Sequence, residues 1–119
     1  MLFRSRNEGA AAAAVFVNGG TAKPVPGTWS ATSELLASEL SPRFPDLTFA
    51  EIRYRLKTWH ALDSCMVDAR AALDVLGRPS LLVGFSMGGA VSIGVADRSE
   101  VTGVLGLAPW IPEIGRAHV

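Results

Sequence analysis

The pattern of apolar and polar residues over the first forty positions predicts one strand and one helix. Residues 13–17 form a continuous apolar run that stops at an Asn-Gly-Gly sequence, which is typical of a buried strand followed by a turn. After a loop that contains two prolines, leucines recur on one face of residues 30–40. Ser30 or Thr32 is in position to cap this helix, and Pro42 ends it, because proline has no amide hydrogen to donate.

The middle of the chain repeats this order of strand and helix. Residues 47–56 place apolar side chains mostly at alternate positions, while Glu51, Arg53 and Arg55 share the opposite face. That alternation predicts a strand near an edge of a sheet. Residues 62–76 carry apolar side chains at steps of three and four, which predicts a second amphipathic helix.

The last third of the chain predicts two more strands with a helix between them. Residues 81–83 and 101–107 are apolar runs, and residues 90–96 have the composition of a buried helix. Strands that are joined by helices run parallel, and their sheet needs helices on both faces. We therefore expect an α/β fold with an open parallel sheet over residues 13–119, after a flexible N-terminal arm of residues 1–12.

The composition is that of a globular domain with few charges. The chain has 119 residues, of which 49% are hydrophobic and 18% are charged, and 11 basic residues balance 11 acidic ones. These values exclude disorder as the main state, and they exclude the basic surface that nucleic-acid binding needs. No apolar run is long enough to span a membrane. The single cysteine, Cys65, is expected to be buried and inert, and such sparse use of cysteine indicates a cytoplasmic protein.

A Gly-x-Ser-x-Gly sequence lies between the strand and the helix predicted near residue 86. In this context the motif places Ser86 on a tight, strained turn, with its hydroxyl exposed above the sheet. Gly84 and Gly88 are small enough for the strand and the helix to pack closely there. The Met87 amide then faces any negative charge that develops near the serine. The alternative is an ordinary glycine-rich turn.

A second glycine turn follows the first predicted strand. A backbone N–H of this Val17-Asn-Gly-Gly-Thr turn is expected to point into the same cleft as Ser86, as the second donor of an oxyanion hole. The alternative is the plain start of a loop. The glycine turn alone is a weak signal for an oxyanion hole. It becomes informative together with the Ser86 motif, because acyl transfer needs two amide donors beside the serine hydroxyl.

With these motifs the sequence resembles an α/β-hydrolase over about residues 13–112. It is most similar to small bacterial hydrolases of the dienelactone-hydrolase type, with a serine at the nucleophile position. The resemblance implies that Ser86 attacks an acyl carbonyl, that a histidine takes its proton and that an acid orients the histidine. It also implies that Met87 and either Gly20 or Thr21 supply the oxyanion amides. The segments that carry the resemblance are Phe16-Val-Asn-Gly-Gly, Arg53-Tyr-Arg, Trp59, Asp68-Ala-Arg-Ala-Ala-Leu-Asp, Leu82-Val-Gly-Phe-Ser-Met-Gly-Gly and Leu107-Ala-Pro-Trp.

The sequence departs from the family at several positions. The family usually has histidine at Asn18 and often at Phe85, and neither is the catalytic base. The family's acid and base follow the serine along the chain. Here His118 is at the tail, Asp97 reads as a solvent-facing residue, and His60 comes before the serine in chain order. We therefore expect the triad's acid and base to be missing from this chain, as in a fragment of a larger hydrolase.

The three tryptophans extend the predicted site. Trp29, Trp59 and Trp110 fall in loops at the predicted carboxyl ends of strands, where open α/β sheets bind ligands. At least two of them are expected to border a pocket with Ser86 for a small-molecule acyl or aromatic substrate; the alternative is that they cover loop joints. The strand over 101–107 would be an unprotected edge and a surface for self-association. Metal-ligand spacing and nucleotide-binding motifs are absent, so we expect neither metal nor cofactor.

The sequence thus predicts a hydrolase of ester or related acyl bonds that acts through a nucleophilic serine. Two other functions stay open: a non-catalytic binding or assembly module of the same fold, and acyl transfer on the same serine. Because the triad's base is expected to be missing, the chain by itself is predicted to have little or no hydrolase activity.

Overall fold

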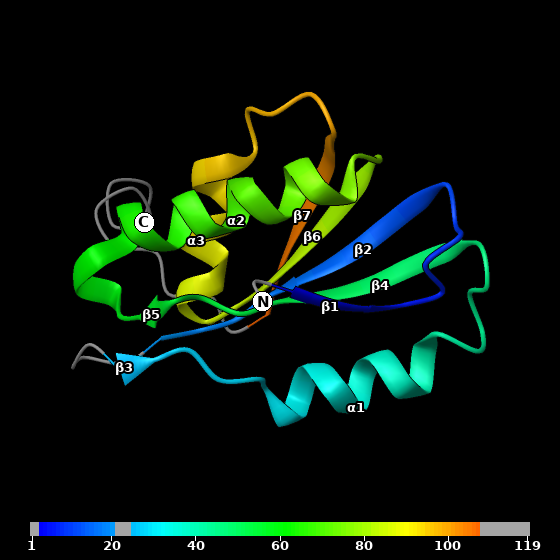
Figure 1. Ribbon diagram of the computed structural model, residues 1–119, viewed down its shortest axis with the longest axis horizontal. Coiled ribbons are helices and arrows are strands. Elements are labelled where there is room, and N and C mark those ends of the chain that lie inside the picture. Colours follow the sequence, from blue (N-terminus) through cyan, green and yellow to red (C-terminus); the bar gives the residue numbers. More distant parts are fainter. Residues whose placement is uncertain (1–2, 21–24, 108–119) are drawn as a thin grey trace.

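The computed structural model describes residues 3–20 and 25–107. The main sheet is mostly parallel: four of its five strands run in one direction, and the strand at one edge, the first in the chain, is antiparallel to its neighbour. The order across the sheet is β1 (Phe3–Arg6), β4 (Leu47–Ile52), β2 (Ala12–Val17), β6 (Ser80–Phe85) and β7 (Val101–Leu107) (Figure 1).

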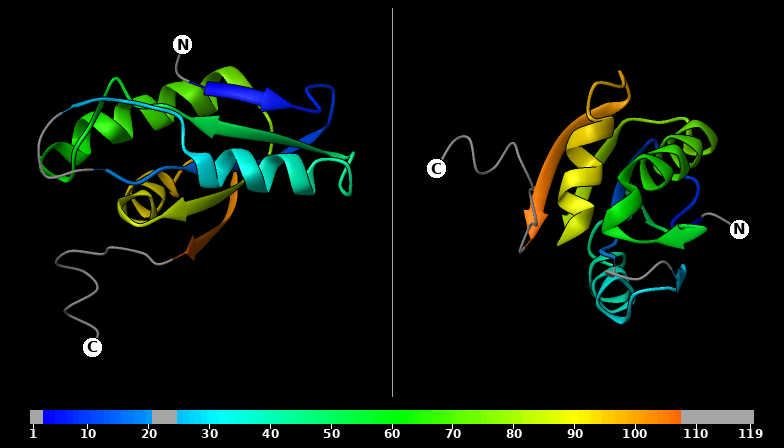
Figure 2. Two further views of the ribbon diagram at one scale, coloured as in Figure 1. Left: turned by 90° about the horizontal axis from the view of Figure 1, so that it is seen from below. Right: turned by 90° about the vertical axis from the view of Figure 1, so that its left-hand side faces the viewer.

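Helices lie on both faces of this sheet. One helix, α1 (Ala31–Leu40), lies on one face, and α2 (Leu62–Leu76) and α3 (Met87–Val95) lie together on the other, as Figures 1 and 2 show. The expected α/β architecture with an open sheet is thereby confirmed. None of the helices in the described part of the chain combines the length and the apolar character that crossing a membrane requires.

Each face of the sheet has its own hydrophobic core. Along β2, alternate side chains point to opposite faces, so Val15 and Val17 contact the α2–α3 layer, while Phe16 contacts the α1 layer. The first core also takes Ile52 and Leu82 from the neighbouring strands and Cys65, Ala69, Leu73, Met87, Val91 and Val95 from the helices. The second core is smaller and is built from Ala14, Phe16, Ala37, Phe49 and Val83.

The strand expected over residues 47–56 is shorter than predicted: β4 ends at Ile52. The apolar alternation continues beyond that point, but the backbone leaves the sheet. The amide of Arg55 donates to the Asp68 carboxylate at 2.8 Å, and the Arg55 side chain pairs with the same carboxylate at 2.7 Å. Residues Leu56–Lys57 then form β5, which pairs with β3 (Val25–Pro26) in a separate two-stranded sheet.

Part of the segment expected as a flexible arm is a strand. Phe3–Arg6 form β1, which is antiparallel to β4, with Arg4 opposite Glu51 and Ser5 opposite Ala50. Phe3 packs against the α2–α3 core, and Arg4 pairs with Glu51. Two arginines in four residues hide the short apolar contribution of this strand, which is why the hydropathy pattern gives no sign of it.

The turn between β6 and α3 is also tighter than the sequence indicates. The strand extends to Phe85 and the helix begins at Met87, so that Ser86 alone joins them. Gly84 lies inside the strand and Gly88 inside the helix. Sequence reasoning assigned this glycine-rich stretch to the turn, because glycine is unfavourable inside both kinds of element.

The topology brings the ends of β2 and β6 together. From β2 the chain crosses by α1 to β4 on one side, and later returns by α2 to β6 on the other side of β2. The register pairs Val17 with Gly84. Asn18 and Ser86, which follow these two strands, therefore lie at the carboxyl edge where the strand order reverses, and this is where open α/β sheets bind ligands.

Candidate functional site: the turn at Ser86

Ser86 has a backbone conformation that serine rarely adopts. Its φ is 53° and its ψ is −120°, and its side chain is exposed. A positive φ of this kind costs a residue other than glycine about 1–3 kcal/mol. Within residues 3–20 and 25–107, the Ser86 hydroxyl takes part in no hydrogen bond. The strain is therefore not compensated by any bond that the side chain makes.

Close packing of three backbones surrounds this turn. A Cβ atom on Gly84 would lie 2.5 Å from the carbonyl oxygen of Gly88, and one on Gly88 would overlap the carbonyl oxygen of Val17. The strand β6, the start of α3 and the end of β2 consequently approach each other as closely as backbones can. Only glycine fits at both positions, and this approach holds Ser86 out at the edge of the sheet.

The N-terminus of α3 directly follows the serine. Met87 is the first residue of the helix, so its amide has no acceptor inside the helix. The aligned peptide dipoles of α3 make this end partially positive. The amide of Ser86 itself donates to the carbonyl oxygen of Leu107, at the end of β7, at 3.2 Å. The backbone on both sides of the hydroxyl is thus fixed, and one amide is available to a negatively charged oxygen.

The loop that follows β2 lies against Ser86. A Cβ on Gly19 would be 3.3 Å from the Ser86 Cβ and 3.8 Å from its hydroxyl oxygen. A Cβ on Gly20 would meet the Met87 sulfur at 2.6 Å. The backbone of this loop therefore runs beside the serine and over the Met87 side chain. Thr21, the other residue expected to supply an oxyanion amide, lies outside the described residues.

Asn18 connects this loop to the rest of the sheet. Its side-chain amide donates to the Glu51 carboxylate at 2.8 Å and to the Ile52 carbonyl at 3.0 Å. Its side-chain oxygen accepts from the Ser33 hydroxyl at 2.8 Å, and its backbone carbonyl accepts from the Tyr54 hydroxyl at 2.7 Å. Sequence reasoning missed this arrangement. The signal was Glu51, a carboxylate between two apolar residues of a buried strand.

The two described tryptophans have different surroundings. The guanidinium carbons of Arg4 and Arg53 lie 4.4 and 5.0 Å from the centre of the Trp29 ring, so this indole is stacked with arginines near β1. Trp59 begins a short 3₁₀ helix, Trp59–Ala61, and meets the His60 ring edge-on. Trp110 lies outside the described residues. A pocket bordered by two of these rings and Ser86 stays a prediction.

Neither of the two described candidates for acid or base, Asp97 and His60, is hydrogen-bonded to the serine hydroxyl. Asp97 follows the C-terminal end of α3, whereas Ser86 precedes its N-terminus, and a helix of this length spans about 14 Å. His60 is exposed, and its backbone amide is bound by the Thr58 hydroxyl. His118 lies outside the described residues. Among the residues that the structure describes, no group of three or more potential ligands is arranged to hold a metal ion.

Burial raises two pKa values close to the loop. The pKa of Tyr54 is raised well above its usual value, mainly by burial and further by the nearby Cys65 and Asp68. Burial also raises the pKa of the Cys65 thiol. Cys65 is fully buried, as expected, and its thiol faces the Leu56 carbonyl oxygen at 3.6 Å. Both groups are thus neutral near pH 7, and the tyrosine hydroxyl is a lasting donor to Asn18.

Comparison with known proteins agrees with this geometry. The model of the alpha/beta hydrolase family matches residues 14–118. A putative hydrolase from Agrobacterium vitis S4 has a similar fold, with a TM-score of 0.64 and 15% identity, over 98% of this chain and 52% of its own. An alpha/beta hydrolase enzyme from a Medee basin deep-sea metagenome library has a TM-score of 0.60 and 22% identity, over 87% of this chain and 46% of its own.

The chain therefore spans about half the length of these solved structures. No curated protein matches its sequence. At these identities the two structures establish the similarity of fold, and the family model covers most of the sequence. The chain belongs to the alpha/beta hydrolase family.

Proposed function

We propose that Ser86 is the nucleophile of a hydrolase that cleaves ester or related acyl bonds. One observation carries the proposal: the hydroxyl of Ser86 is exposed and unbonded within the described residues, on a turn whose positive φ is strained. Backbone strain that no local bond compensates is characteristic of functional sites. The neighbouring amides add what a nucleophile alone lacks, namely donors for a developing oxyanion.

The proposed reaction begins with attack of the Ser86 oxygen on the acyl carbonyl carbon. The new C–O bond forms while the carbonyl oxygen takes the electron pair, and the amides of Met87 and of Gly20 or Thr21 donate to that oxyanion. Collapse of the intermediate breaks the bond to the leaving group and produces an acyl-enzyme. Water then releases the acid and restores the serine.

A general base must accept the serine proton in the first step. We propose that this base and its orienting acid are supplied by residues other than those in contact with Ser86 in the described structure. The oxyanion donors and substrate binding alone supply about 10³-fold of rate enhancement. The described part of the site therefore accounts for only a small share of the activity of the whole protein.

The test is labelling with a fluorophosphonate probe, which reacts with activated serines. The natural protein that contains this sequence should be labelled at Ser86, and the Ser86→Ala variant should not be labelled. Ser99→Ala is the matched control, because Ser99 is also exposed but lies in the loop between α3 and β7. Mass spectrometry of the labelled peptide identifies the modified residue.

The isolated 119-residue chain provides a second comparison. It should be labelled much more slowly than the natural protein, because proton transfer from the serine is lost. Equal labelling of both proteins would show that the base is already among these residues. A lack of labelling in both would overturn the proposal and favour a non-catalytic binding module.

A further inference from the structure

A buried polar cluster is centred on Glu51 of β4, the strand next to β2 and its loop. The Glu51 side chain is 5% exposed, and a buried carboxylate is costly unless it is paired and hydrogen-bonded. Here four donors surround it. Arg4 donates to one oxygen from two nitrogens, at 3.1 and 2.8 Å, while the Asn18 amide and the Ser30 backbone amide donate to the other at 2.8 and 2.6 Å.

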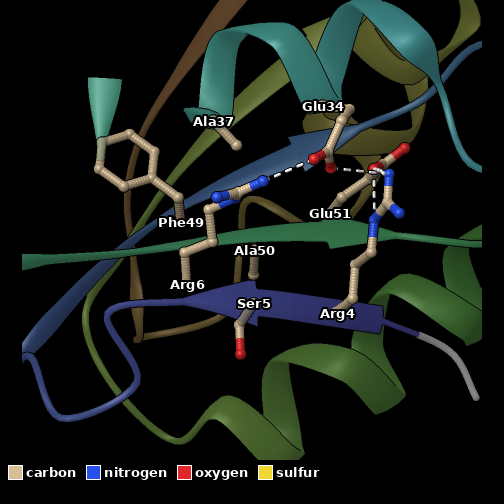
Figure 3. Close-up of a pocket in the computed structure, with 8 residues that line it drawn as sticks. All are labelled: Arg4, Ser5, Arg6, Glu34, Ala37, Phe49, Ala50 and Glu51. Carbon is tan, nitrogen blue, oxygen red and sulfur yellow. Dashed lines mark hydrogen bonds and ion pairs between the residues drawn. The ribbon is translucent and has the colours of Figure 1, made fainter. Parts of the chain in front are cut away.

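Figure 3 shows how Arg4 reaches this carboxylate from the edge strand β1. Arg4 also contacts Glu34 of α1, at 3.1 Å, and Arg6 pairs with the same Glu34 at 2.5 Å. These charged groups line a cavity of about 240 Å³ between β1, β4 and α1. Since the charges in it are paired with each other, the cavity offers no free charge to a ligand. Its polar groups hold structure instead.

The structural consequence of the cluster is felt at Asn18. Every polar atom of the Asn18 side chain is occupied, by Glu51, Ser33 and the Ile52 carbonyl, and its own carbonyl is held by Tyr54. The residue Asn18 is only 7% exposed, so water does not compete for these hydrogen bonds. The direction in which the chain leaves Asn18 is therefore set by β4 and α1.

The residues that follow have no side chains to fix them. Gly19 and Gly20 are the segment whose backbone lies beside Ser86 and Met87. Glycine has the greatest backbone freedom of all residues, so a loop of two glycines needs an anchor from outside. An oxyanion donor must also be held within a fraction of an ångström of its productive position.

We propose that Asn18 and Glu51 are positioning residues that hold the Gly19–Gly20 backbone against Ser86, with Arg4 of β1 as the group that pairs with the Glu51 carboxylate and orients it. This inference rests on the proposed function for its catalytic consequence, but its structural part is independent of it. It assigns a role in the site to the edge strand, which lies two strands away from β2 and its loop.

The first variant to test is Glu51→Gln in the natural protein. Glutamine keeps the size of the side chain, but its NH₂ group faces either Arg4 or the Asn18 amide, and both of these are donors. Glu34→Gln is the matched control, because it also removes a carboxylate partner of Arg4 but touches neither Asn18 nor the loop. Ser33→Ala removes only the donor to the Asn18 oxygen and is a milder second variant.

Two readouts separate positioning from general stability. Hydrogen exchange of the Gly19 and Gly20 amides, followed by NMR, should be faster in Glu51→Gln than in the wild type or in Glu34→Gln. With the fluorophosphonate, the maximal inactivation rate should fall about 10- to 100-fold while the half-saturating probe concentration changes little, because the donors are displaced but the binding surface is kept. Ser33→Ala should show the same changes with smaller size.

The outcomes distinguish the two proposals. If the wild type is not labelled at all, the proposed function fails, and the exchange rates alone decide the positioning role. If Glu51→Gln and Ser33→Ala both keep the exchange rates and the inactivation rate of the wild type, the positioning role is wrong. If Glu51→Gln does not fold, Ser33→Ala and Tyr54→Phe, which remove single donors to Asn18, decide in its place.

Discussion

Asn7 and Ser86 share a positive φ, 58° and 53°, and in the described part of the chain they are the two residues other than glycine that do so. The Asn7 side chain donates to the carbonyl oxygens of Ser41, Phe44 and Leu47, at 2.9, 3.4 and 3.2 Å. It thereby ties the turn between β1 and β2 to the loop before β4. The Ser86 side chain makes no bond at all within the same residues.

The two strained conformations are maintained in different ways. At Asn7 the cost of the backbone is offset by hydrogen bonds of the same residue, and asparagine adopts positive φ more readily than most residues. At Ser86 the conformation is maintained by the packing of Gly84 and Gly88 against β2, and it leaves a hydroxyl free. The strained turn at Asn7 thus connects parts of the fold, whereas the strained turn at Ser86 exposes the hydroxyl that we propose as the nucleophile.

The largest expected difference between the two turns appears when a nearby glycine is replaced by alanine. Gly88→Ala should destabilise the protein by about 3 kcal/mol or more, because its Cβ would overlap the Val17 carbonyl oxygen. Gly9→Ala, next to the Asn7 turn, has open space around its Cβ. It should change the free energy of unfolding by less than about 0.5 kcal/mol. Urea unfolding of both variants measures the contrast, and equal losses would contradict it.

Alanine at the two strained positions should separate stability from reactivity. Asn7→Ala loses its bonds to three carbonyl oxygens and should cost about 1–2 kcal/mol, with the labelling of folded protein unchanged. Ser86→Ala should leave the free energy of unfolding within about 0.5 kcal/mol of the wild type, because the hydroxyl has no hydrogen bond to residues 3–20 or 25–107 that would be lost. Its labelling by the fluorophosphonate should disappear. A large loss of stability in Ser86→Ala would show that the hydroxyl has a structural partner.

Alkaline pH should weaken the anchor of the Ser86 loop, while the Asn7 anchor has no group that titrates. Burial raises the pKa of Tyr54, so the folded state holds this proton more tightly than the unfolded state. The stability that results is complete below the unfolded pKa of about 10, and it is lost as the pH rises towards the folded value. The slope for one such group is about 1.4 kcal/mol per pH unit.

The measurement is direct, because Tyr54 is the only tyrosine in the chain. The ultraviolet absorbance of its phenolate should appear at higher pH in the folded protein than in urea. Tyr54→Phe should flatten the fall in stability above pH about 10. Cys65, whose pKa is also raised, is retained in both proteins, so that the difference isolates the tyrosine. Titration of the folded protein at the unfolded pKa would refute the prediction.

The smallest expected effect comes from replacing each strained residue with glycine. The free energy of unfolding should then change in opposite directions at the two turns. Ser86→Gly should raise the free energy of unfolding by about 1 kcal/mol, because it relieves a strained φ without the loss of a bond. Asn7→Gly relieves the same strain but also removes the bonds to Ser41 and Leu47, so it should lower stability by about 1 kcal/mol. Thermal unfolding resolves the two signs, and a destabilised Ser86→Gly would count against stored strain.

The sequence predicted those parts of the fold that depend on nearby residues. Continuous apolar runs located β2, β6 and β7, alternation of apolar and polar positions located β4, and helical spacing located α1 and α2. The strands β1, β3 and β5 were missed, because segments of two to four residues with arginine, proline or lysine have no distinct pattern. The turn at Ser86 was predicted because all of its parts, from Gly84 to Gly88, are contiguous in the chain.

The anchoring of the loop was beyond sequence reasoning for the opposite reason. The bonds from Asn18 to Ser33 and Glu51 span 15 and 33 positions, and the bond from Arg4 to Glu51 spans 47. No periodicity relates such residues. They meet only because β4 crosses to the far side of β2 and β1 pairs with it from outside. A carboxylate inside a buried strand signals that donors must surround it, without saying which residues supply them.

The last strand, β7, is hydrogen-bonded to the turn at Ser86. β7 is at the far end of the sheet, and Leu105 and Leu107 are 49% and 37% exposed there. The carbonyl of Leu107 is also the acceptor for the Ser86 amide. A polypeptide or ligand that binds to this exposed apolar edge strand would therefore contact the strand that is hydrogen-bonded to the backbone of Ser86. A change in the position of the outermost strand is therefore expected to be transmitted to the backbone of Ser86.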